Sequence, residues 1–328
     1  NSPLPTSFTS DASLLLPIHS LGTDYIATSW RHRQRALTLQ GFVAIVAVED
    51  GTIVSITPTA DVAEGEDFEA IPAGETFTVE MDAGQLLTLT TAGPDGADLT
   101  GSVITATEPI AVFGGHVCGN VPNSDTNFCD HLEEQLPPVE HWGSQFVIGR
   151  IAQRTDEDFE LVRVVAAEDD TALTWDPPRE EEMVLAAGEY VDVTPEGAAV
   201  LTASAPVLVT AFTRSQQAEN SDGQADPSMV VLAPTQSWTR DLTVHVVEGW
   251  EVSRAIIFAP IEAEITLDGE LLAVEAIGIG ESGYVQFSLE LEAGTHTLAA
   301  DLPIHATIYG AARSTSYAAP ATSAFTLD

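Results

Sequence analysis

Three stretches of the chain share an opening proline and a matched apolar pattern: EPIAVFGG at residues 108–115, APVLVTAFTRS at 205–215 and LPIHATIYGAARS at 302–314. Their prolines, Pro109, Pro206 and Pro303, follow one another at a constant interval of 97 residues. Apolar and polar residues that alternate are typical of half-buried β-strands. Matched segments at equal spacing indicate an internal repeat, in which one structural unit is used several times.

The repeat extends beyond these strands. FVAIVAVEDGTIVSITP at 42–58 matches LVRVVAAEDDTALTWDP at 161–177, and a weaker copy occupies 254–269. We therefore predict an all-β fold of three repeated β-sandwich-like units of about 97 residues, with a partial fourth copy at the end. The unit boundaries predicted from the sequence are 1–117, 118–216, 217–315 and 316–328. A β-propeller is the second choice, since the period is about twice that of a normal blade.

Short turns join the predicted strands. Asp50-Gly51 and Asp268-Gly269 each separate two strand-like runs, and Asp-Gly in that position predicts a two-residue β-hairpin. The best helix candidate is DHLEEQL at 130–136, which Pro137 would stop. The alignment of the repeats favours an extended segment there instead.

Composition limits the classes of function. Hydrophobic residues make up 44% of the 328 residues, which is enough for real cores. Fifty acidic residues face 11 basic ones, all arginines, for a net charge of −39. A cationic face for nucleic acid is therefore absent, and no apolar run is long enough to span a bilayer. The acidity fits either an acidic secreted protein or adaptation to salt or divalent cations.

Two cysteines, Cys118 and Cys129, lie 11 positions apart in CGNVPNSDTNFC. A disulfide is the default in an extracellular chain. The alternative is a metal site, because His and Cys side chains at such spacings can bind zinc. The further candidate ligands around the loop are His116, Asp130, His131 and Glu134.

No catalytic motif is found. The sequence contains no Gly-x-Ser-x-Gly elbow, His-Glu-x-x-His motif, phosphate-binding loop or dinucleotide fingerprint. Acidic loops at 122–130 and 221–226 could bind Ca²⁺ through oxygen atoms, although neither matches an EF-hand. Otherwise no cofactor is expected, and an enzyme is the least favoured class.

One segment, DLTGSVITATEPIAVFGGHVCGNVPNSDTNFCDHLEEQLPPVEHWG at 98–143, resembles the N-terminal domain of the IgG Fc-binding protein family. That family shows the pattern DLTGS…PVAVFGGH…C…VP…CDHLxEQxPP…WG. Supporting matches are LGTDYIATSW at 21–30, VAVEDGTIVSITP at 46–58, ADPSMVVLAP at 225–234 and TIYGAARSTSY at 307–317. The resemblance therefore covers nearly the whole chain.

The resemblance implies that Cys118 and Cys129 are the Cys pair of the family. It also implies a secreted module, mucin-associated or on a bacterial surface, and it carries no residues that contact immunoglobulin. The lack of lysine favours a bacterial or archaeal, extracellular member.

Together these observations predict a non-catalytic extracellular or cell-surface protein. We favour a self-assembling subunit of a filament or coat that associates head to tail, since an unfinished β-unit leaves edges that need a partner strand. The alternative is an adhesion module that binds a protein or glycan. The predicted assembly strand consists of Ser323, Ala324, Phe325, Thr326, Leu327 and Asp328.

Overall fold

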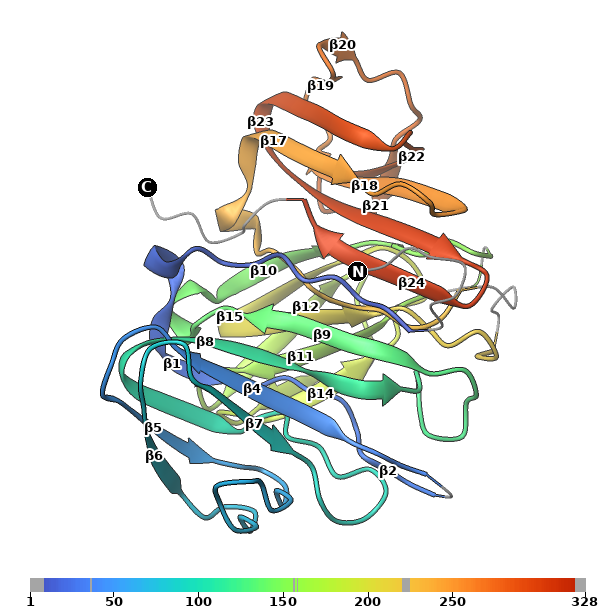
Figure 1. Cartoon of the computed structure of the whole chain (residues 1–328). Helices are drawn as coiled ribbons and strands as arrows, with labels where there is room; N and C mark the ends of the chain where they lie inside the picture. The colour runs from blue at the N-terminus through green and yellow to red at the C-terminus, as the bar shows by residue number, and fades with distance from the viewer. Residues whose placement is uncertain (1–8, 36, 156, 158, 220–224, 322–328) are drawn as a thin grey trace.

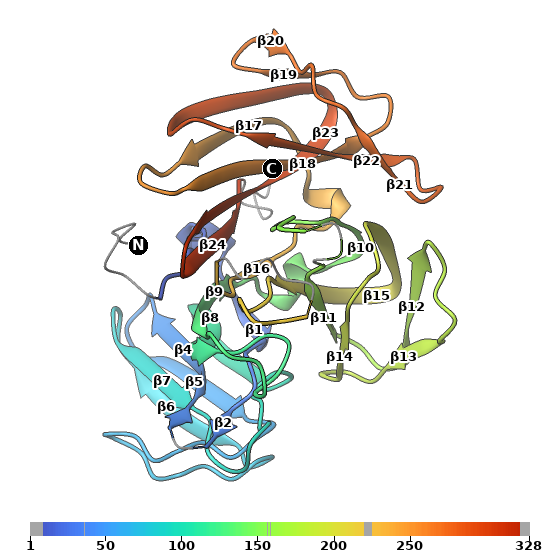
Figure 2. The same cartoon turned by 90° about the vertical axis from the view of Figure 1, so that its right-hand side faces the viewer.

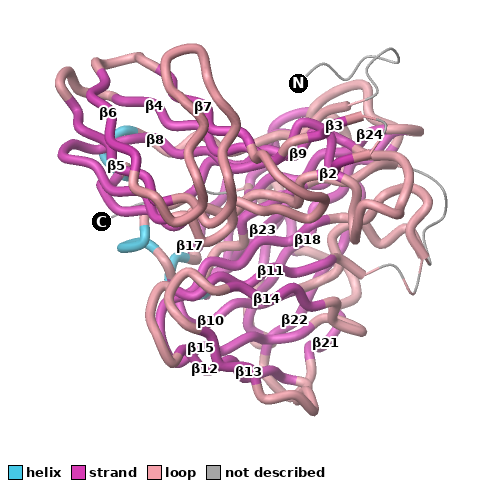
Figure 3. The backbone as a smooth tube through the Cα atoms, turned by 90° about the horizontal axis from the view of Figure 1, so that it is seen from below, coloured by secondary structure: helices cyan, strands magenta, loops and turns pink. Residues whose placement is uncertain are grey.

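A computed structural model describes residues 9–35, 37–155, 157, 159–219 and 225–321. Apart from a two-stranded hairpin, the strands form three sheets, which lie in three regions of the molecule in Figure 1. Helix is limited to three short 3₁₀ turns among the described residues (Figure 3): η1 (Ile18–Ser20), η2 (Val139–His141) and η3 (Thr235–Ser237). Each of these turns follows a proline and precedes the first strand of a sheet. The fold is all-β, as predicted.

The first sheet contains β1 (Gly22–Ile26), β4 (Gly41–Ala47), β5 (Thr52–Thr57), β6 (Phe77–Met81), β7 (Leu86–Thr90), β8 (Val103–Gly119) and β9 (Asp130–Leu136). The second contains β10 (Gly143–Ile148), β11 (Leu161–Ala166), β12 (Thr171–Asp176), β13 (Met183–Leu185), β14 (Tyr190–Val193), β15 (Ala199–Phe212) and β16 (Met229–Val231). In the sequence, the hairpin of β2 (Arg33–Gln34) and β3 (Thr38–Leu39) comes between β1 and β4.

The third sheet contains β17 (Thr239–Val246), β18 (Val252–Pro260), β19 (Ile265–Leu267), β20 (Glu270–Leu271), β21 (Ile277–Ile279), β22 (Tyr284–Glu290), β23 (Gly294–Ala312) and β24 (Thr315–Pro320). Its pairing repeats that of the other two sheets. The candidate helix at Asp130–Leu136 is the strand β9, in agreement with the alignment of the repeats.

One long strand organises each sheet: β8, β15 or β23. In β8, residues 103–106 pair with β1 and β5, whereas residues 110–119 pair mainly with β4 and β9. Pro109 lies between the two sets of partners, and Pro206 and Pro303 occupy the same place in β15 and β23. A proline has no N–H to donate to a ladder, so a position between two sets of partners accommodates it.

The two predicted hairpins have different outcomes. The turn at Asp268-Gly269 joins β19 and β20, which pair with each other as predicted. The prediction at Asp50-Gly51 was wrong, because β4 and β5 pair with different parts of β8 rather than with each other. Gly51 still forms a tight turn, with a φ of 70°, but that turn carries the chain across the sheet.

The C-terminal segment assigned from sequence to a partial fourth copy pairs with the third sheet. Residues 315–320 form β24, which is antiparallel to β23 just as β9 is to β8 and β16 is to β15. From this pairing we propose that the units begin at the 3₁₀ turns η1, η2 and η3. The predicted assembly strand, Ser323–Asp328, lies outside the described residues.

The cores of the units are continuous with one another. Val165 and Leu208 of the second sheet pack in the same apolar cluster as Ile45 and Val54 of the first. A second cluster joins second-sheet residues to Ile256, Phe258 and Tyr309 of the third. All six residues of β11 are buried, since neighbouring structure covers both of its faces.

Candidate functional site

Cys118 and Cys129 form a disulfide, with 2.00 Å between the sulfur atoms. His116 lies beside it on β8, and its Nδ1 accepts a hydrogen bond from the Cys118 N–H at 3.0 Å. His116 is 1% exposed, and this burial lowers its pKa to about 4, so the ring is neutral at physiological pH. The His116 ring therefore supports the backbone next to the disulfide.

The other candidate metal ligands lie on opposite faces of β9. Side chains alternate along a strand, so Asp130 and Glu134 point to one face and His131 to the other. His131 stacks on Phe42 and contacts the Glu133 carboxylate at 3.2 Å, whereas Asp130 and Glu134 are buried. Within the described residues, no group of three or more His, Cys, Asp and Glu side chains could hold a metal ion. The structure does not bring the predicted ligands together.

The acidic loops considered for Ca²⁺ are only partly described. Residues 220–224 lie outside the described part of the chain. In the other loop, Asn123 Oδ1 accepts the Asp125 N–H at 3.0 Å, and Asp125 forms an ion pair with Arg35. Binding of Ca²⁺ stays a prediction.

Removing the disulfide should destabilise the protein by about 3 kcal/mol, because the reduced loop regains conformational freedom in the unfolded state. We expect this loss for Cys118→Ser/Cys129→Ser, measured by urea denaturation. Reducing agent should lower the stability of the original protein by a similar amount and leave the double variant unchanged, since no free cysteine occurs among the described residues. Equal stability of oxidised and reduced protein would contradict the prediction.

A buried ionic network joins the loop before β8 of the first unit to the second sheet at Arg163, on β11. Its guanidinium donates to Asp98 at 2.7 Å and binds Asp192 through two nitrogens at 2.8 and 2.9 Å. It also lies 4.2 Å from the centre of the Tyr190 ring. Although burial opposes ionisation, the Arg163 charge and the hydrogen bonds from Thr100 lower the pKa of Asp98. Sequence reasoning did not identify this network.

A second polar cluster lies where the last strands of the three sheets meet. In Figure 1 the dark-blue N-terminal segment, residues 9–16, passes between β24 and β9, and Figure 2 places β9, β16 and β24 beside one another. We call residues 9–16 the strap. Four carboxyl groups are buried at this three-sheet junction: Asp11, Asp130, Glu134 and Asp226.

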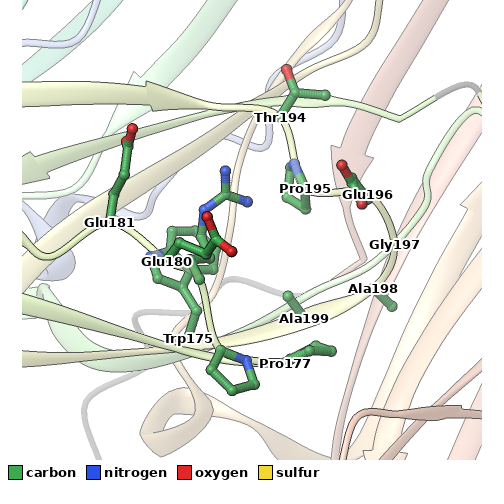
Figure 4. A pocket seen from close by; sticks show the side chains of 12 residues that line it. Trp175, Pro177, Glu180, Glu181, Thr194, Pro195, Glu196, Gly197, Ala198 and Ala199 are labelled. Carbon is green, nitrogen blue, oxygen red and sulfur yellow. The ribbon is translucent and has the colours of Figure 1, made fainter.

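An open cleft of about 660 Å³ lies in the second unit, between the loop after β12 and the loop between β14 and β15. Figure 4 shows Glu180 and Glu181 on the first loop and Glu196 on the second. All three glutamates are exposed. The Arg179 guanidinium lies 5.7 Å from the centre of the Trp175 ring, which is 5% exposed. Three carboxylates and one guanidinium leave the cleft with a negative charge.

Residues 11–310 match the protein family described as "IgGFc binding protein". The chain belongs to the IgGFc-binding protein family. It is 29% identical to the human IgGFc-binding protein over 322 residues, which is 95% of this chain and 6% of that protein. The chain therefore spans a small part of the length of this relative.

Comparison with solved structures gives only a weak likeness. Two anti-sigma factor domain-containing proteins, one of them from Clostridium clariflavum, are each 9% identical to the chain. The match to the first protein covers 89% of this chain and 81% of that protein's chain. The match to the second covers 90% of this chain and 91% of that protein's chain. Both TM-scores are 0.15, so nothing about the fold is transferred from them.

The IgGFc-binding family pattern at 98–143 falls mainly on structural positions of this chain. Asp98 is a partner of Arg163, and Asp130 and Glu134 lie in the three-sheet junction. Gly114 and Gly115 lie where a Cβ atom would meet the backbone carbonyl oxygens of Thr28 and Leu132. The motif that identifies the family therefore reports mainly on how the first unit is built and joined to its neighbours.

Among the described residues, no helix is long and apolar enough to cross a membrane.

Proposed function

We propose that this chain is an extracellular, non-catalytic module that binds a partner protein. Family membership over residues 11–310 is the observation that carries this proposal, because the human relative is named for binding another protein. The geometry supports the same class of function. An exposed cleft with charged rims, held between two loops of a β-sheet unit, is suited to recognition.

Charge supports a basic segment as the part of the partner that is bound. The chain carries a net charge of −39, and the cleft offers Glu180, Glu181 and Glu196 to a cation. The Arg179 guanidinium already lies beside the Trp175 ring. An arginine of the partner could add a second cation–aromatic contact in the same cleft. Opposite charge would also accelerate association.

The filament proposal now has less support than the binding proposal. It depended on an unfinished repeat at the C-terminus, but residues 315–320 pair with β23 inside the third sheet. The strand that was expected to be donated to another molecule, Ser323–Asp328, lies beyond the described residues. A bacterial or archaeal source and recognition of a glycan stay predictions from the sequence.

Binding can be tested with two probes, the human IgG Fc fragment and a short arginine-rich peptide. We expect binding of a basic probe to weaken at least about tenfold in Glu180→Gln/Glu181→Gln/Glu196→Gln, since a charge-assisted contact contributes about 1.5–3 kcal/mol. Surface plasmon resonance at low and at physiological salt measures the loss.

A matched control removes the same charge elsewhere. Glu64, Glu66 and Glu69 are exposed on a loop of the first unit, so Glu64→Gln/Glu66→Gln/Glu69→Gln changes net charge equally. An equal loss of binding in both triple variants would assign the effect to overall charge and reject the cleft. If neither probe binds, the proposed basic partner is wrong.

A further inference from the structure

The strap connects the last strands of all three sheets through polar contacts. The Ser10 N–H donates to Asp130 Oδ1 on β9 at 2.6 Å, and its hydroxyl lies 2.6 Å from that of Thr315 on β24. The Asp11 carboxylate accepts the Glu133 N–H at 3.2 Å and the Met229 N–H, on β16, at 3.0 Å. One short segment therefore holds the three units at a common point.

Three of the acidic side chains at the junction, Asp11, Asp130 and Glu134, make the strap's contacts, and the carboxyl group of Asp226 is buried beside them. Asp11, Asp130, Glu134 and Asp226 are respectively 6%, 0%, 2% and 3% exposed. Glu134 accepts from the Ser13 hydroxyl at 2.8 Å and from the Val231 N–H at 3.3 Å, and Asp130 accepts from Thr315 at 3.1 Å. Hydrogen bonds compensate part of the cost of burial, but a buried carboxylate without a strong cationic partner remains expensive.

The charged groups around the junction do not offset the cost of burying these four carboxylates. Burial and the neighbouring Glu134 raise the pKa of Asp11 well above its usual value, and burial also raises that of Glu134. Burial raises the pKa of Asp130 to about 8, helped by Asp226, and raises that of Asp226 to about 7. Arg154, from the loop after β10, lowers the pKa of Asp226 without overcoming its burial.

Among the described residues, further titratable groups lie beside the junction on β9 and around β24. His131 and Glu133 point to the opposite face of β9 and contact each other at 3.2 Å. Arg313 comes just before β24, and its carbonyl oxygen accepts from Gln216. Electrostatic repulsion and desolvation among the four acids therefore dominate the response of the junction to pH.

We propose that the three-sheet junction is a pH-operated latch: its buried carboxyl groups hold the strap when they carry protons and loosen it when they lose them. Each of these acids binds its proton more tightly in the folded state than in the unfolded chain. The stability that this contributes is fully present below about pH 4 and is lost as the pH rises through about 7 to 8. At alkaline pH the strap separates from β9 before the sheets themselves unfold.

The latch can be tested by amide hydrogen exchange of the full chain, read on peptides that contain the strap and β9. After correction for the intrinsic effect of pH, we expect exchange of the strap to be at least about tenfold faster near pH 9 than near pH 5. In Asp130→Asn the amide can accept from Ser10 and donate to Thr315 without acquiring charge, so the change should shrink severalfold.

Further variants make the test decisive. Glu134→Gln removes a second buried charge and should shrink the change as well, so the test stands if Asp130→Asn fails to fold. Glu66→Gln, on an exposed loop, should respond to pH like the original protein. The proposal is overturned if strap exchange is independent of pH, or if the folded junction variants keep the full pH response.

Discussion

Arg163→Met should destabilise the protein by about 3–5 kcal/mol, because it leaves the buried carboxylate of Asp98 without its cation and Asp192 paired with Arg31 alone. The side chain of Arg163 is fully buried and that of Asp98 is 5% exposed, so water cannot replace the lost contact. Methionine fills part of the space but supplies none of the donors. Chemical denaturation at neutral pH measures the loss.

Arg35→Met provides the control. Arg35 also pairs with an aspartate, Asp125, but that aspartate is largely exposed. Solvent screens an exposed pair, so this variant should denature like the original protein. Equal stability of Arg163→Met and Arg35→Met would show that the buried network does not stabilise the protein as expected.

Gly114→Ala should cost about 3 kcal/mol or more, since a Cβ atom there would lie 1.8 Å from the carbonyl oxygen of Thr28. The obstacle is backbone, so no side-chain rotation relieves it. Gly278→Ala is the matched control, because a Cβ on this strand residue meets nothing within 4 Å. We expect the thermal midpoint to fall for Gly114→Ala and to stay within a degree or two for Gly278→Ala; equal midpoints would contradict the packing argument.

The sequence was sufficient to predict strands and their repetition. Apolar patterns around Pro109, Pro206 and Pro303 are local signals, and each proline lies on the equivalent long strand. Pairing partners are not a local property. The Asp50-Gly51 turn has the right residues for a hairpin, but β8 competes successfully for the edges of both flanking strands.

The candidate site was harder to predict, because closeness in sequence does not mean closeness of side chains. His131 and Asp130 are neighbours along β9, yet they face opposite sides of the strand. Arg163 carried a usable signal, since its counterparts in the other two units are Ala44 and Ile256. A charged residue at an apolar position of a repeat indicates a buried partner, but Asp98 could be identified only once the sheets were placed together.

The long strands have a mechanical consequence. Because β8 pairs with two sets of strands, β1 with β5 and β4 with β9, the two sets cannot separate unless β8 bends or gives up its backbone ladder with one of them. The same strand arrangement recurs in β15 and β23. Tension on such a unit is shared between its two halves, so the unit resists as a whole until it gives way in one step. Because shared apolar clusters also join neighbouring units, the three units would resist such tension together rather than one after another.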